Sequence, residues 1–122
     1  MSDWKSNLIR DGIAQQGYIK EVPGIHGDLS FSYRPMLGQK AELYADKVAK
    51  EINANAERGY LLVCDIVADH VTAWSEPVDP SKESMRCLKK GLLYAMYYII
   101  RGERASDSLE ASKTGDELLG KS

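Results

Sequence analysis

Apolar and polar residues alternate from Leu29 through Phe31 to Tyr33, which is the two-residue period of a half-buried β-strand. A weaker alternation covers residues 18–22 and ends at a loop rich in proline and glycine, residues 23–27. Together the two runs predict a β-hairpin with one apolar face. Because an isolated hairpin is barely stable in water, we expect it to pack on helices or on another chain.

Beyond residue 36 the apolar positions recur every three or four residues, which is the period of an amphipathic α-helix. This period predicts one helix over residues 37–52 and a second over residues 60–74. It predicts a third helical region over residues 80–101, with a break near Lys90 and Gly91. Gly102 follows directly and is placed to end that helix, as glycine often does.

Composition divides the chain into three parts. Residues 1–16 mix scattered apolar and polar residues and form an N-terminal arm, and residues 17–102 form the hairpin and helical domain. Residues 103–122 hold five acidic and three basic residues and few large apolar ones, which predicts a flexible, disordered acidic tail. The predicted fold is α+β and mainly helical, with an N-terminal β-hairpin packed on about three helices.

The overall charge and the apolar content narrow the class of protein. Sixteen Lys and Arg against eighteen Asp and Glu give a net charge of −2, which weakens a role in nucleic-acid binding. The longest apolar run, residues 92–100, is far shorter than the roughly 20 residues of a membrane-spanning helix. The N-terminus lacks the pattern of a signal peptide, and two cysteines are too few for a secreted domain that is stabilised by several disulfides. We therefore expect a cytoplasmic protein.

The charges of the two later helical segments have opposite signs. Residues 57–79 carry five acids and one base, a balance of −4, and residues 80–101 carry five bases and one acid, a balance of +4. Two antiparallel helices with these charges would attract each other along their exposed edges. The same charges could instead align neighbouring subunits.

The candidate catalytic or metal-binding side chains are Cys64, Asp65, Asp69, His70 and Cys87. Their spacing matches no compact zinc motif, and Cys64 lies within an apolar run. Cys64 and His70 fall on different faces of one helix, which argues against a nucleophile and base pair. Asp65 and Asp69 share a face, as solvated acids opposite an apolar stripe commonly do. We therefore predict no enzyme activity, no metal and no cofactor.

Four basic residues, Lys82, Arg86, Lys89 and Lys90, nearly trace one face of the third helical region. Such a face is the feature that a small nucleic-acid-binding regulator would use. The acidic total and the acidic neighbouring segment weigh against this function, which is kept as the alternative hypothesis.

The last helix carries more aromatic residues than its inner face can hold. Tyr94, Tyr97 and Tyr98 cannot all face the interior, and Tyr94 and Tyr98 lie on one stripe with Lys90 and Arg101. Tyrosine and arginine are enriched in protein–protein contacts, so these five residues are the candidate protein interface. The other interpretation is that the rings cover the hairpin within the same molecule.

Four motifs follow one another between residues 29 and 102. The first motif is the end of a strand, Tyr33-Arg34-Pro35, and the second is a later segment that ends in Trp74. The third is Pro-Val-Asp-Pro at residues 77–80, and the fourth is the aliphatic end of the last helix, which is followed by Gly102. In this order they resemble a family of small tail-assembly proteins of long-tailed bacteriophages and prophages, often called tail assembly chaperones.

The resemblance implies a protein without enzymatic activity or cofactor that works in the cytoplasm of the host bacterium. Its implied partner is the tail tape-measure protein or the tail-tube protein, which it binds until the tail is built; a homo-oligomer is compatible with this role. A long helical tape-measure chain exposes apolar stripes before the tube encloses it, and a small helical domain with an aromatic face would cover them.

Overall fold

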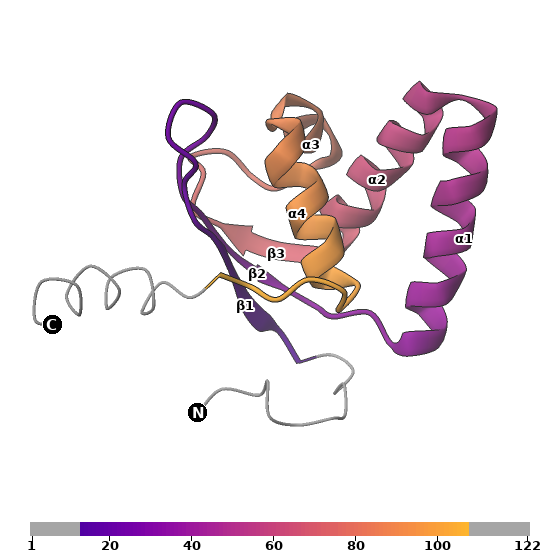
Figure 1. Cartoon of the computed structure of the whole chain (residues 1–122). Helices are drawn as coiled ribbons and strands as arrows, with labels where there is room; N and C mark the ends of the chain where they lie inside the picture. Colours follow the sequence, from indigo (N-terminus) through magenta and orange to yellow (C-terminus); the bar gives the residue numbers. More distant parts are fainter. Residues whose placement is uncertain (1–12, 108–122) are drawn as a thin grey trace, which may run out of the picture.

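The computed structural model describes residues 13–107 as a small antiparallel sheet covered on one face by helices (Figure 1). Its three strands lie in the order β1 (Gln15–Ile19), β2 (Leu29–Tyr33) and β3 (Val71–Trp74). The helices are α1 (Gly38–Ala54), α2 (Ala56–His70), α3 (Lys82–Cys87) and α4 (Lys90–Ile100). Helix α4 contacts β1, α2 contacts β3 and α4, and α1 packs mainly on α2. The predicted fold class, α+β and mainly helical, is confirmed.

The predicted hairpin is present, and its apolar face is the one predicted. Strands β1 and β2 pair antiparallel, with Gly17 opposite Phe31, and Leu29, Phe31 and Tyr33 are all buried. The first strand nevertheless begins three residues earlier than the sequence pattern indicates. Val22 lies outside it because it forms a tight loop with His26, in which Gly24 takes a φ of +81° that other residues rarely adopt.

The helix predicted over residues 60–74 is wrong in its last turn. Helix α2 ends at His70, and the next four residues form β3, which pairs antiparallel with β2. The join is fixed where the Arg34 N–H donates to the His70 carbonyl at 2.9 Å. The open edge of β2 offers backbone partners to this segment, and its β-branched and aromatic residues suit a strand as well as a helix.

The third helical region is broken, as predicted, but slightly earlier. Helix α3 ends at Cys87 and α4 begins at Lys90, so the break lies at Leu88 and Lys89. Gly102 ends α4 with a φ of +81°, and its N–H donates to the Ile99 carbonyl at 3.0 Å. The predicted helix end is therefore confirmed.

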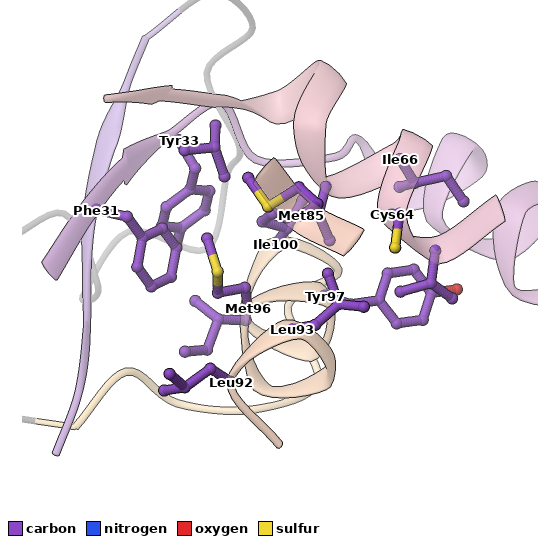
Figure 2. Close-up of a cluster of buried hydrophobic side chains, with 14 of the residues drawn as sticks. Phe31, Tyr33, Cys64, Ile66, Met85, Leu92, Leu93, Met96, Tyr97 and Ile100 are labelled. Atoms are coloured by element: carbon purple, nitrogen blue, oxygen red, sulfur yellow. The ribbon is translucent and has the colours of Figure 1, made fainter. Parts of the chain in front are cut away.

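The core fills the space between the inner face of the sheet and the helices α2, α3 and α4 (Figure 2). Phe31 from β2, Met85 from α3 and Leu93, Met96 and Ile100 from α4 are all fully buried there. Within residues 13–107, no helix has the length and apolar character needed to cross a bilayer.

The ends of the predicted domain are displaced relative to the sequence prediction. Residues 1–12 of the arm and 108–122 of the tail lie outside the described residues. Gln15 and Gln16, which the composition assigns to the arm, belong to β1. Residues 103–107, the start of the predicted tail, run beside β1 (Figure 1), and Ser106 and Asp107 are hydrogen-bonded to Tyr18 and Lys20.

The predicted charge pairing between α2 and the basic segment after it is not found within residues 13–107. The ion pairs there are Lys50–Asp46, Arg58–Glu51, Arg101–Glu103 and Arg104–Asp107. None joins α2 to α3 or α4, because these helices meet through apolar side chains of the core. Arg101, the last base of this segment, instead pairs with Glu103.

Candidate protein-interaction surface

Helix α4 directs its tyrosines to two different places. Tyr97 is only 2% exposed and belongs to the buried core (Figure 2). Tyr98 is 40% exposed, and Tyr94 is half-buried. Tyr97 comes three positions after Tyr94, and the rotation of the helix over this step turns Tyr97 inward with Leu93 and Ile100. The inclusion of Tyr97 among the interface candidates is therefore wrong, since its ring is needed in the core.

Tyr94 and Tyr98 remain at the surface on one side of α4. The Lys90 ammonium lies 5.7 Å from the centre of the Tyr94 ring, a cation–π arrangement one turn before it. Partial burial raises the pKa of the Tyr94 hydroxyl, so it stays a neutral hydrogen-bond donor at physiological pH. Lys90 and Tyr94 therefore lie together on this surface, where they present an ammonium group and a neutral hydroxyl.

Arg101 is engaged within the molecule. Its guanidinium carbon lies 5.1 Å from the Tyr97 ring centre and 5.8 Å from the Tyr98 ring centre, and one guanidinium nitrogen pairs with Glu103 at 2.7 Å. Arg101 thus holds the Tyr98 ring in place. Its charge is already compensated, so it is not the free cation that the sequence pattern indicates.

Tyr60 of α2 is a further member of this surface and was not among the interface candidates. Its ring is half-buried, and its hydroxyl donates to the Arg86 carbonyl at 3.2 Å. Burial raises the pKa of this hydroxyl, which also lies near Cys64 and Tyr94. We call Tyr60, Tyr94 and Tyr98 the tyrosine surface. Only the packing of α2 on α4 brings Tyr60 near Tyr94, which in turn lies one turn from Tyr98, so no periodicity in the sequence joins the three.

The four basic residues of the alternative hypothesis do not form one helical face. Lys82 and Arg86 lie on α3, whereas Lys89 and Lys90 begin α4 beyond the break. The Lys89 ammonium donates to the Ile25 carbonyl of the hairpin loop at 2.6 Å. The break and this contact divide the basic stripe.

Cys64 and His70, two of the candidate catalytic residues, point to different sides of α2. Cys64 is fully buried toward Tyr60 and Tyr94, and burial raises the pKa of its thiol. His70 faces α1, where its ring meets the Tyr44 ring edge-on at 6.3 Å between centres. Among residues 13–107, no three histidine, cysteine or acidic side chains are grouped as a metal site requires.

Asp65 lies in a shallow open groove of about 220 Å³ between α1 and α2. The groove has an apolar floor of Leu61 and Leu62, and an ion pair of 3.1 Å between Glu51 and Arg58 lies at its edge. Its rim carries both signs of charge, so it does not select an acidic or a basic ligand.

Buried His70 gives the fold a predicted pH dependence. Its Nδ1–H donates to the Ile66 carbonyl at 2.7 Å, while its Nε2 is buried without a partner in the described part of the chain. Burial is the main cause that lowers the pKa of this imidazole; nearby Lys40 adds to it, and the hydrogen bond to Ile66 opposes it. The unfolded chain therefore takes up a proton more readily than the folded one.

We expect the free energy of unfolding to be highest, as far as His70 determines it, above about pH 6.5. It should fall as the pH drops from there toward the lowered pKa of His70 in the folded chain. The slope from this group reaches at most about 1.4 kcal/mol per pH unit. Urea denaturation at several pH values between 7.5 and 5 checks this expectation. His70→Asn, which keeps a donor near the position of Nδ1, should flatten the dependence, whereas the matched control His26→Asn should not. Equal slopes for both variants would contradict this assignment.

Comparisons with protein-family models, with curated proteins and with solved structures found no match to this chain. Among residues 13–107, Tyr98 is the aromatic residue with an exposed ring, and it lies on a helix that is anchored in the core. The function of the chain is therefore inferred from its own residues and from their surroundings.

Proposed function

We propose that this protein is a phage tail assembly protein. In this role it is a non-enzymatic chaperone that binds the tape-measure or the tail-tube protein through the tyrosine surface. The observation that carries this proposal is the 40% exposed Tyr98 ring, held by Arg101 beside the half-buried Tyr94 on a helix anchored in the core.

The tyrosine surface has the properties of a protein-binding surface. Its rings are held by the packing of two helices, so little side-chain entropy is lost when a partner binds. Each ring offers apolar area, and the hydroxyls can form hydrogen bonds at the rim of a contact. An apolar stripe on a partner helix suits such a surface, because it would be covered reversibly and without covalent chemistry.

Three of the four motifs that carry the family resemblance meet at one place in the fold, and residues 77–80 lie outside it. Tyr33, at the end of β2, pairs with Val71. The next residue, Arg34, donates from its guanidinium to the Asp69 carbonyl at 2.9 Å. The Met36 N–H donates to the Ile100 carbonyl at 3.2 Å. These three motifs therefore have a shared structural role: together they join β2 to the ends of α2 and α4.

Binding to purified tape-measure and tail-tube proteins tests the proposal. We expect Tyr98→Ala combined with Tyr94→Ala to weaken binding to one of them by about tenfold or more, as measured by calorimetry with purified proteins. The matched control is Leu43→Ala, which removes a 67% exposed apolar side chain from α1, away from the tyrosine surface. Circular dichroism must show that all variants keep the fold.

Two results would contradict the proposal. One is that neither tail protein binds the unaltered chain, and the other is that the double tyrosine variant and Leu43→Ala bind equally well. Binding to one of the two tail proteins alone would identify the partner. Tyr97→Ala is unsuitable for this test because it removes a core residue.

A further inference from the structure

The outer edge of β1 is occupied by the segment that follows α4. The Asp107 N–H donates to the Tyr18 carbonyl at 2.8 Å, and the Tyr18 N–H donates to the Ser106 hydroxyl at 2.7 Å. The Lys20 N–H donates to the Asp107 carboxylate at 2.9 Å. We call residues 103–107 the strap.

The strap occupies the place beside β1 where a further strand could pair, but it is not itself a β-strand. In an antiparallel sheet, alternate residues direct their N–H and C=O groups to opposite sides, so Tyr18 and Lys20 point away from β2. A further strand would meet both N–H groups with backbone carbonyls. Here two side-chain oxygens, from Ser106 and Asp107, take that place, and a single backbone N–H completes the set. The edge of β1 is therefore suited to strand pairing, and among residues 13–107 it is blocked by Ser106 and Asp107.

The charges along β1 favour an antiparallel copy of the same strand as the alternative occupant. The charged residues at β1 are Lys20 and Glu21, both directly after its end, and residues 15–19 carry no charge. In a parallel pair of copies, Lys20 would lie beside Lys20 and Glu21 beside Glu21. In an antiparallel pair centred near Gly17 or Tyr18, each charge meets an uncharged residue at the opposite end.

The exposed apolar residues next to β1 favour the same arrangement. Ile13 precedes the strand and is 43% exposed, and Val22 follows it and is 42% exposed. An antiparallel copy places the Ile13 end of one chain beside the Val22 end of the other, and it does so twice by symmetry. Each of these side chains then gains apolar surroundings.

We propose that the edge of β1 is an interface between two copies of this chain, and that the strap closes it. In the dimer, the two sheets join through antiparallel β1 strands into one sheet of six strands. The strap and the second copy use the same backbone groups of Tyr18 and Lys20, so they exclude each other. Open strand edges associate readily, and a strap that covers one edge keeps the chain monomeric. This interface is separate from the tyrosine surface and does not depend on the proposed function.

The test compares the oligomeric state of the full chain with that of Ser106→Ala combined with Asp107→Ala. Sedimentation equilibrium at several concentrations should give a monomer for the full chain. The double variant should dimerise with a dissociation constant lower by about tenfold or more. Asp107→Asn is the matched control, because its amide oxygen still accepts from Lys20 N–H, and we expect it to remain monomeric.

A proline at residue 16 identifies the surface that dimerises. Gln16 has the same parity as Tyr18, so its N–H points away from β2 and Gln16→Pro removes no backbone hydrogen bond to that strand. It does remove the 2.7 Å bond from Gln16 Nε2 to the Ser32 hydroxyl, which lies on the exposed surface. Added to the double variant, this change should restore the monomer. A dimer that survives Gln16→Pro would place the contact elsewhere and overturn the proposal.

Other results also decide the matter. A double variant that is folded and monomeric at every concentration overturns the proposal, and so does a full chain that dimerises as strongly as the variant. If the double variant stays monomeric but binds a tail protein more tightly than the full chain does, the edge of β1 is not an interface between two copies, and the proposal is overturned. If the double variant does not fold, Ser106→Ala alone leaves both Asp107 contacts in place, and it should show a smaller shift toward dimer. A folded Ser106→Ala chain without any shift then counts against the proposal.

Discussion

Replacing Gly17 by alanine is expected to lower the free energy of unfolding by about 3 kcal/mol, the upper end of the usual cost of overpacking. The Phe31 ring lies directly over Gly17, and a Cβ at this position would come within 2.7 Å of both Cε atoms of the ring. The ring has no room to move, because it is fully buried and packs against Tyr33 at 5.4 Å between centres. Urea denaturation followed by circular dichroism measures the loss.

A double-mutant cycle identifies the ring as the cause. In a Phe31→Leu background the side chain opposite Gly17 is shorter, so Gly17→Ala should cost distinctly less than in the unaltered chain. Phe31→Leu itself will destabilise the fold, because it removes apolar volume from the core. If the effects of the two changes simply add, the cost of Gly17→Ala arises elsewhere.

Replacing Gly59 by alanine is expected to cost about 2 kcal/mol in net terms. Helices α1 and α2 lie close together here, since a Cβ on Gly59 would lie 2.9 Å from Ile52 Cα and 3.0 Å from Ile52 N. A backbone cannot give way as a flexible side chain can, so α1 must shift away from α2. Overpacking of this kind costs up to about 3 kcal/mol, and the better helix propensity of alanine returns about 1 kcal/mol.

Gly91→Ala provides the matched control for this change. Gly91 also lies within a helix, but a Cβ there would meet no atom within 4 Å. Only the helix propensity changes, so this variant should be more stable by up to about 1 kcal/mol. Thermal and urea unfolding of both variants measure the contrast. A Gly59→Ala chain that is stabilised like Gly91→Ala would show that the α1–α2 contact adapts without cost.

Helical periodicity predicted the candidate interface residues only in part. Four-residue spacing correctly placed Tyr94 and Tyr98 on a common side of α4, because this relation is fixed by the helix alone. It could not exclude Tyr97 or include Tyr60, since both depend on where α2 packs. The basic stripe failed for a related reason: the break at Leu88 and Lys89 interrupts the periodicity that defined it.

The strap was also beyond the reach of sequence patterns. Residues 103–107 have a polar composition that is typical of a disordered tail, and they hold no apolar anchor. Their order comes from the exposed backbone groups of Tyr18 and Lys20, which lie more than eighty residues earlier in the chain. Contacts between such distant segments leave no periodic signal in the sequence.

The amino-acid sequence by itself determined the local features of this protein: the apolar face of the hairpin, the α1 helix, and the glycine end of α4. Each follows from residues that are neighbours in the chain, so its energetics are local. Tertiary structure alone decided that residues 71–74 leave the helix to join β2, and that Tyr97 enters the core while Tyr60 joins the surface. The physical reason is that a segment able to form either helix or strand follows the backbone partners it meets, and those partners are set by the packing of the whole chain.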